Sequence, residues 1–509
     1  MSVQSEPSPH SSTQAAPGLA LPADEILVGG RWRRGRGLPV RPLDPATGRE
    51  LTVIQAASVE DVEEAARAGA RAAADPAWRG LLPHERARYL YRIAELIERD
   101  TDELSALQTA NTGKTRAETT ALVRSAAGTF RYVAATLETA EDALTPSRGA
   151  YVTMSVHEPL GVVGAITPWN SPIASEAQKV APALAAGNAV LLKPAEWTPL
   201  VALALGRIVE EAGLPAGLLS VLPGKGSIVG DAIVRHPLVS KVTFTGGTTT
   251  GRTIAHHAAD KLIPVSLELG GKSPTVVLPD ADVEQALAGV LFGIFSSSGQ
   301  ACIAGSRLFV PESLYDEFVG ELVRRTEQLR VGPGTDPRTQ VGPLAHPRHR
   351  DAVAAYVELA RKEGGRIRCG GAAPEGEQYA GGAYYLPTVI DGLPNDARTC
   401  QEEIFGPVLV CLPYKDEEDL LAQANGSVYG LACGIWTRDA RAAWRLAGLL
   451  EAGTVWINTY KQFSSSTPFG GFKESGLGRE KGRDWIRSYQ RQKSLYWGTD
   501  ATPLPWAAV

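Results

Sequence analysis

Glu268 and Cys302 are the two residues of this chain whose types and surroundings suit covalent chemistry on a carbonyl compound. Glu268 stands before a glycine pair in residues 267–272, and Cys302 stands in the glycine-containing residues 299–307. A thiolate attacks a carbonyl carbon, and a carboxylate activates water against a thioester. These are the two groups that covalent oxidation of an aldehyde requires.

The surroundings of Cys302 differ from those of the other cysteines. Gly299 and Gly305 flank it in a polar turn that follows the serines at 296–298, so we expect an accessible and activated thiol. Elsewhere a free cysteine is usually a small buried apolar residue. That interpretation applies to Cys369, Cys400, Cys411 and Cys433. The cysteines are widely spaced, with no CxxC pair and no histidine cluster, so neither a disulfide framework nor a metal site is expected.

Two further segments have the features of a nucleotide site. Lys193 and Glu196 follow a predicted strand, and nucleotides bind at strand ends in open α/β sheets. The carboxylate can accept hydrogen bonds from ribose hydroxyls and the ammonium can donate one, although a surface ion pair has the same spacing. Residues 242–251 run from a strand into a glycine-rich turn and a helix, whose first N–H groups can receive a pyrophosphate. Because Glu196 would repel a 2′-phosphate, NAD is favoured over NADP.

The elements that must position these residues form two blocks of alternating strands and helices. The predicted strands are residues 161–166, 189–192, 219–222 and 241–245 in the first block, and 275–278, 306–310, 408–412 and 453–458 in the second. This alternation favours parallel, doubly wound sheets. A capping box at residues 58–61 predicts the start of an earlier helix. Gly187 and Gly213 are predicted to end helices of the first block.

Composition narrows the class of protein. The chain has 509 residues, 44% of them hydrophobic and 21% charged, as is ordinary for a soluble globular protein. A net charge of −5 gives no general attraction for nucleic acid or an anionic membrane. Residues 1–24 are rich in Ser, Pro and Ala and are predicted to be a disordered tail. Without a secretory signal or a long apolar run, a cytoplasmic location is the default expectation.

The motifs, in their wording and order, resemble the aldehyde dehydrogenase superfamily. The resemblance covers about residues 26–497 and includes Pro168-Trp169-Asn170, residues 403–407 and residues 468–476. It implies an α/β fold with a Rossmann-like cofactor domain, an α/β catalytic domain and a small β oligomerisation segment. The expected boundaries are 25–146 and 161–271 for the NAD-binding domain, 272–482 for the catalytic domain, 147–160 and 483–497 for the oligomerisation segment, and 498–509 for a C-terminal extension.

The resemblance also implies catalytic roles. Cys302 would be the nucleophile, Glu268 would activate the hydrolytic water, and Asn170 would donate its side-chain amide to the oxyanion beside the backbone N–H of Cys302. Lys179 and Glu480 match positions proposed to relay protons away from Glu268, and a structural ion pair is an equally good interpretation of them.

NAD is the cofactor that the resemblance implies. Glu403 would hold the nicotinamide ribose and Phe405 would pack on the ring. This chain has Gly247 where the family often has Ser, so backbone donors are expected to carry more of the phosphate contact. The expected cofactor-binding residues are Thr167, Trp169, Lys193, Glu196, Gly226, Phe244, Gly246, Gly247, Thr248, Leu269, Glu403 and Phe405.

The expected substrate pocket is wide and polar. The family frequently places large apolar side chains where this chain has Ser171, Ser175 and Gln178, and Phe463 is the expected apolar wall. Ala301 and Ile303 flank the nucleophile. This pattern suggests a bulky or functionalised aldehyde. No arginine falls at an obvious pocket position, which argues against a semialdehyde whose carboxylate needs a partner.

Three alternatives remain open at this stage. A CoA-acylating dehydrogenase would release the thioester to CoA, although Glu268 favours water. A catalytically silent binding protein with the same fold is disfavoured by the intact Asn170, Glu268 and Cys302. Esterase activity through Cys302 is a conceivable side reaction. A homodimer or homotetramer is expected from the resemblance.

Overall fold

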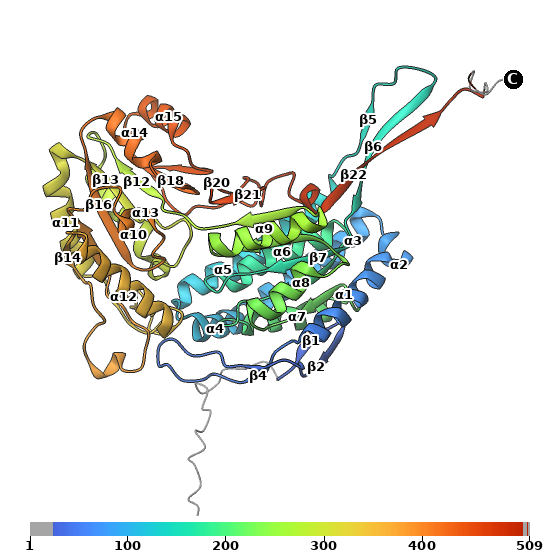
Figure 1. Ribbon diagram of the computed structural model, residues 1–509, viewed down its shortest axis with the longest axis horizontal. Helices are drawn as coiled ribbons and strands as arrows, with labels where there is room; N and C mark the ends of the chain where they lie inside the picture. The colour runs from blue at the N-terminus through green and yellow to red at the C-terminus, as the bar shows by residue number, and fades with distance from the viewer. Residues whose placement is uncertain (1–23, 502–505, 507–509) are drawn as a thin grey trace, which may run out of the picture.

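The computed structural model describes residues 24–501 and residue 506, and it has two α/β lobes and a projecting β arm (Figure 1). The predicted N-terminal tail lies outside the described residues except for Asp24, and part of the predicted C-terminal extension also lies outside them. Each lobe is built on its own large sheet, and the arm is a separate three-stranded sheet.

The first sheet confirms the predicted doubly wound arrangement. Its strands run in the order β2-β1-β9-β8-β7-β10-β11-β21, and the five from β9 to β11 are parallel. The parallel strands are β7 (Val162–Ile166), β8 (Ala189–Lys193), β9 (Leu219–Val221), β10 (Val239–Thr245) and β11 (Val265–Glu268). The edge strands are β1 (Ile26–Val28), β2 (Arg31–Arg33) and β21 (Gly476–Leu477). Strand order reverses between β7 and β10, and ligands bind beside such a reversal, outside the carboxyl ends of the strands.

Helices cover both faces of this sheet (Figure 1). They are α1 (Val59–Ala74), α3 (Pro83–Arg99), α4 (Thr101–Thr112), α5 (Arg116–Glu138), α6 (Pro172–Ala185), α7 (Leu200–Glu211), α8 (Asp231–Arg235) and α9 (Thr248–Lys261), with a short α2 (Pro76–Arg79). The predicted capping box is present, since Ser58 and Asp61 each accept a hydrogen bond from the other's backbone N–H. Gly187 follows α6 with φ 93°, the left-handed geometry that favours glycine after a helix.

The second sheet also follows the predicted strand pattern. Its order is β14-β15-β16-β13-β12-β18-β19, and every neighbouring pair except β14 and β15 is parallel. The strands are β12 (Pro274–Val277), β13 (Arg307–Pro311), β14 (Arg366–Cys369), β15 (Thr388–Asp391), β16 (Val408–Tyr414), β18 (Ala432–Trp436) and β19 (Thr454–Ile457). The main helices around it are α10 (Val283–Phe295), α11 (Tyr315–Glu327), α12 (Pro347–Lys362), α14 (Glu417–Asn425) and α15 (Ala440–Leu449).

The arm joins two distant parts of the chain. Strand β6 (Tyr151–Pro159) pairs with β5 (Ala143–Thr145) on one side and with β22 (Gln490–Gly498) on the other. Residues from the two ranges that the resemblance grouped into one segment, 147–160 and 483–497, therefore do pair, while the role of this segment in oligomerisation stays a prediction. Figure 1 shows the arm leaving the first lobe.

The sheets differ in two places from the domain boundaries expected from the sequence. Strand β21 lies within residues 272–482 but pairs with β11 of the first sheet. Trp485, Ile486 and Tyr489 lie in the predicted oligomerisation segment but pack in the core of the first lobe. The chain thus returns to the first lobe before it enters the arm, and the domain division itself stays a prediction.

Candidate active site

A cavity of about 980 Å³ lies where the carboxyl ends of the first sheet face the second lobe. Thr167, Lys193, Gly246 and Glu268 reach it from the ends of β7, β8, β10 and β11. Every residue of the expected site lines this cavity except Lys179 and Thr248. The sequence motifs are therefore brought together at the strand ends, as the topology requires.

The loop that carries Cys302 is held in a strained conformation. After α10, Ser297 and Ser298 adopt φ values of 58° and 55°, in the left-handed region that is costly for residues other than glycine. Gly299 follows with φ 69°, and a Cβ there would lie 2.0 Å from the carbonyl oxygen of Gly406. A Cβ on Gly271 would lie 2.4 Å from the carbonyl oxygen of Cys302. The glycines of both motifs thus permit close backbone contacts that fix the thiol beside the end of β11.

Cys302 is partly exposed, unlike the other four cysteines, but its surroundings act against ionisation of the thiol, so its activation stays a prediction. Burial, together with the negative charges of Glu403 and Glu268, raises the pKa of Cys302 to about 12. The backbone N–H groups of Ile303 and Cys302 itself act in the opposite direction. The glycine-rich turn indicated accessibility, but it carried no information on the carboxylates that the fold places around the sulfur.

Glu268 is a buried carboxyl with spare hydrogen-bonding capacity. Its side chain reaches the cavity, and its Oε2 has no hydrogen-bond partner among the described residues. Burial raises its pKa well above the usual value and Glu480 adds to the rise, while Lys179 opposes it. A carboxyl with a raised pKa is a stronger base once it ionises, as general-base catalysis requires.

Lys179 and Glu480 form the predicted ion pair behind Glu268. Lys179 Nζ donates to Glu480 Oε1 at 2.7 Å and to Thr243 Oγ1 at 3.2 Å, and both charged side chains are almost fully buried. Lys179 comes from α6, whereas Glu480 comes from the segment that follows β21. The pair ties that segment to the first lobe and places a second carboxylate within electrostatic range of Glu268.

Asn170 lies against the nucleophile loop. Its Nδ2 donates to the backbone oxygen of Gln300 at 2.9 Å. This bond uses one of the two amide hydrogens and orients the side chain. The second hydrogen remains for an oxygen bound near Cys302, so the geometry is compatible with the expected oxyanion donor.

The nucleotide side of the cavity contains a cation, a carboxylate and an uncapped helix start. Lys193 is buried, and this burial lowers its pKa to about 8, against the opposing effect of Glu196. No side chain caps α9, so its first N–H groups remain available to an anion. Gly246 lines the cavity, while its N–H donates to the backbone oxygen of Glu268 at 3.0 Å, so its role toward the cofactor stays a prediction.

A chain of aromatic rings crosses the cavity between the lobes. Trp169 lies 5.2 Å from Phe405 and 4.9 Å from His349, measured between ring centroids, and Trp197 stacks on His346 at 4.6 Å. Phe405 has φ 59°. Beside it, Glu403 Oε1 accepts from the N–H of Gly271 at 3.0 Å, and burial raises the pKa of Glu403 to about 7.

The substrate end of the cavity has a polar wall and an aromatic wall. Ser171, Ser175 and Gln178 lie along α6, and Phe463 packs edge-on against Phe469 at 5.4 Å. Lining residues that were not expected from the sequence include Leu122, Ser125, Trp197, His349 and Lys481, while Phe469 lies within the motif of residues 468–476. Lys481 directly follows the expected residue Glu480, whereas α5 and α12 gave no local signal.

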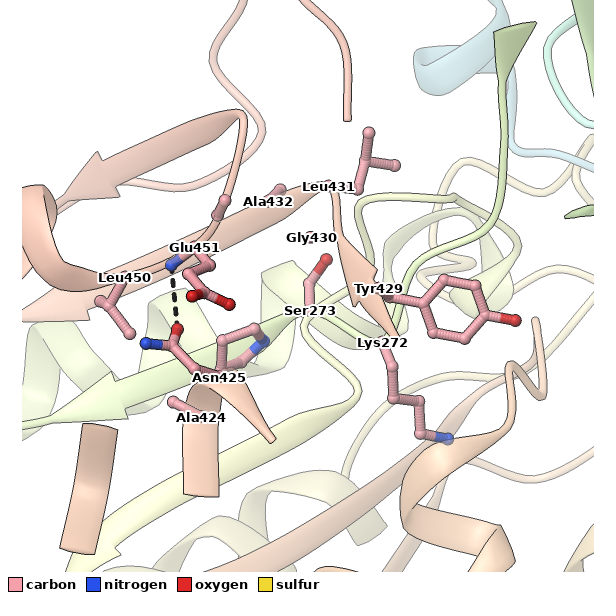
Figure 2. A pocket seen from close by; sticks show the side chains of 12 residues that line it. Lys272, Ser273, Ala424, Asn425, Tyr429, Gly430, Leu431, Ala432, Leu450 and Glu451 are labelled. Carbon is pink, nitrogen blue, oxygen red and sulfur yellow. Dashed lines mark hydrogen bonds between the residues drawn. The ribbon is translucent and has the colours of Figure 1, made fainter. Parts of the chain in front are cut away.

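A much smaller pocket lies inside the second lobe, and Cys302 is not among the residues that line it. Figure 2 shows its lining, in which the N–H of Glu451 donates to Asn425 Oδ1 at 2.9 Å. The ammonium of Lys272 forms a separate hydrogen bond, in which Nζ donates to the backbone oxygen of Glu402 at 2.6 Å. These bonds tie loops together, so we interpret this pocket as structural.

Residues 24–501 and 506 contain no group of three or more His, Cys, Asp and Glu side chains arranged to hold a metal ion. Within the same part of the chain, no helix is long and apolar enough to cross a membrane.

The chain is similar to known proteins over nearly its whole length. The profile of the aldehyde dehydrogenase family matches residues 32–495. Phenylacetaldehyde dehydrogenase from Pseudomonas fluorescens is 42% identical over 498 residues, which cover 96% of this chain and 98% of that protein.

Two solved structures support the same assignment. Betaine aldehyde dehydrogenase from Staphylococcus aureus, solved with NAD+, has a TM-score of 0.94 at 34% identity and covers 96% of this chain and 97% of its own. The NAD+ complex of an aldehyde dehydrogenase from Bacillus cereus has a TM-score of 0.91 at 37% identity, with coverages of 94% and 96%. Together with the match to the family profile over residues 32–495, these similarities show that the chain belongs to the aldehyde dehydrogenase family.

Proposed function

We propose that this aldehyde dehydrogenase oxidises a bulky or functionalised aldehyde to its carboxylic acid with NAD, through an adduct on Cys302. One observation carries the proposal: Cys302, Asn170 and Glu268 line one cavity that continues into the nucleotide-side residues. The polar wall formed by α6 supports a functionalised substrate.

The residues of the cavity fit NAD. The uncapped start of α9 suits the pyrophosphate, Lys193 and Glu196 suit a ribose, and Glu403 reaches the opposite end of the cavity. The dinucleotide supplies the hydride acceptor of the oxidation. Glu196 also disfavours a 2′-phosphate, so we expect a higher kcat/KM with NAD than with NADP.

The protein's own groups account for the covalent steps. Cys302 Sγ, once deprotonated, adds to the carbonyl carbon, and the oxygen that gains charge is met by the Asn170 amide and the Cys302 N–H. Each such donor is typically worth about 2.7–4 kcal/mol to the transition state. Loss of hydride from the adduct carbon leaves a thioester on Cys302. Glu268 then takes a proton from water, which hydrolyses that thioester, and the Lys179–Glu480 pair lies where the proton can pass on.

Water is favoured over CoA as the acceptor because Glu268 reaches the reacting end of the cavity with an oxygen that lacks a partner. Product analysis with and without CoA separates the two reactions. The free acid should form at the same rate in both, and formation of an acyl-CoA would favour the acylating alternative.

Rapid-mixing measurements of NADH absorbance test the proposal with two variants. Cys302→Ala should form no NADH from any aldehyde, since no adduct can form. Glu268→Gln should keep an initial burst of about one NADH per active site and then turn over slowly, because only hydrolysis is impaired. Steady NADH formation by Cys302→Ala at the wild-type rate would refute the covalent route.

A further inference from the structure

Lys481 is a buried, positively charged residue at the substrate end of the cavity, and none of the proposed reaction steps involves it. It follows Glu480 and lines the cavity with Phe463 and Phe469. The residue is 8% exposed. Its backbone has φ 60°, in the left-handed region. A residue other than glycine persists there only where its surroundings impose the conformation, and such residues cluster at functional sites.

No acidic side chain among the described residues forms an ion pair with Lys481. Its ammonium instead lies 4.0 Å from the centroid of the Phe463 ring and 5.6 Å from that of Phe469. Lys193, at the nucleotide end of the cavity, also lacks such a partner among the described residues, whereas two buried lysines outside the lining have one. Lys179 pairs with Glu480, and Lys272 donates to a backbone oxygen. The Lys481 side chain is thus largely buried in the cavity wall, and its ammonium has no hydrogen-bond or ion-pair partner among the described residues.

The negative groups near Lys481 do not supply that partner. Glu480, Glu268 and Cys302 lie within electrostatic range and favour the charged ammonium, although burial has the larger and opposite effect and lowers the pKa of Lys481. Glu480 is already bonded to Lys179, Glu268 forms no ion pair with Lys481 and keeps an unpartnered Oε2, and Cys302 is occupied by the reacting carbon during turnover. The position beside the ammonium therefore suits an anion that enters with the substrate.

We propose that Lys481 binds a carboxylate of the substrate, so that the preferred substrates are aldehydes that carry a carboxylate on an apolar or aromatic body. The body would pack on Phe463, the carboxylate would face Lys481, and the aldehyde would face Cys302. This inference deepens the proposed function and rests on it. The lack of an arginine in the pocket does not disfavour a semialdehyde, because Lys481 can supply the positive charge.

Matched pairs of aldehydes test the assignment. Each pair joins a carboxylate-bearing aldehyde to a neutral counterpart: 6-oxohexanoate with hexanal, 5-oxopentanoate with pentanal, and 4-formylbenzoate with benzaldehyde. For at least one pair, kcat/KM of the wild-type enzyme should be at least tenfold higher for the carboxylate. The variant Lys481→Met should lower that kcat/KM by roughly 10- to 100-fold, as expected for loss of a hydrogen bond to a charged group, with little change for the neutral partner.

Two further variants complete the experiment. Lys481→Arg keeps the charge and should retain most of the preference, while Lys362→Met removes an exposed lysine at the end of α12 and should change neither substrate. Turnover of neutral aldehydes shows that each variant is folded. Equal losses on both members of a pair would mean that Lys481 acts on Glu268 or Cys302, and would overturn the assignment.

The two proposals fail in distinguishable ways. If the wild-type enzyme forms NADH from neutral aldehydes but shows no carboxylate preference that Lys481→Met removes, only the role of Lys481 is refuted. If it forms no NADH from either member of any pair, the proposed function fails and the role of Lys481 fails with it.

Discussion

At Cys302, burial and two neighbouring carboxylates together oppose formation of the thiolate. Burial is the main cause of the raised thiol pKa, followed by Glu403 and then Glu268. We predict that Glu403→Gln lowers the pKa of Cys302 and increases the rate of iodoacetamide alkylation several-fold at pH 8. The pKa of Glu403 is about 7, so this carboxyl is mostly ionised at pH 8 and mostly neutral at pH 6. The gain should therefore fade as the pH falls to 6.

Glu402→Gln is a matched control for that measurement. Glu402 adjoins Glu403 in sequence but bonds Arg398 and Tyr356 outside the cavity. Its substitution should leave the alkylation rate unchanged. A similar increase in both variants would show that the effect comes from loosening of the loop, not from the charge beside the sulfur.

Sequence alone predicted the residues whose roles depend on local motifs. Cys302, Glu268 and Asn170 stand in short segments with a fixed order, and the fold brings them to one cavity. His349 stands in no such segment, and Lys481, although it directly follows Glu480, owes its position in the site to Phe463 and Phe469. The raised pKa of Cys302 was missed because it depends on burial and on carboxylates that are distant in sequence.

Among the elements, α6 carries an unusual buried carboxyl. Glu176 is fully buried, and neither of its side-chain oxygens has a partner among the described residues. Burial raises its pKa well above the usual value. We predict that Glu176→Met increases the free energy of unfolding by about 1–3 kcal/mol, because it removes unsatisfied polar atoms from the core. Urea denaturation measures the change.

The pH dependence of this gain has a definite sign. Above about pH 4.5 the unfolded chain releases the Glu176 proton while the folded protein retains it, so rising pH destabilises the wild-type fold. The advantage of Glu176→Met should therefore be larger at pH 8 than at pH 5. Glu317→Met, at an exposed site on α11, is the control and should show neither effect. A less stable Glu176→Met variant would mean that the carboxyl has an internal partner.

The strands around α6 and strand β21 show which secondary-structure elements could be predicted from the sequence and which could not. The strands on either side of α6 were predicted to within one residue, since short β-branched runs and Gly187 delimit them. Strand β21 has only two residues and depends on its pairing with β11. Such a strand has no periodicity of its own, so it could not be predicted.

For the whole molecule, the arm is the feature that predicts assembly. Leu144, Tyr496 and Trp497 are 74%, 73% and 69% exposed in the single chain, and exposed apolar surface of this kind marks contact sites. We predict a homodimer or homotetramer in which the arm is covered. The double variant Tyr496→Ser, Trp497→Ser should have a lower mass by light scattering, whereas Trp444→Ser, on the exposed side of α15, should not. An unchanged mass would place the contact elsewhere.

The arm also constrains how the protein is made. Strand β6 ends at Pro159, and its partner β22 begins at Gln490, after nearly all the intervening chain has been translated. At about 5–20 residues per second, the ribosome needs on the order of tens of seconds to supply it. During that time the edge of β6 lacks the strand that covers it, and such edges attract other chains. Nascent chains stalled before β22 should therefore aggregate or bind chaperones more than those released a few residues beyond it.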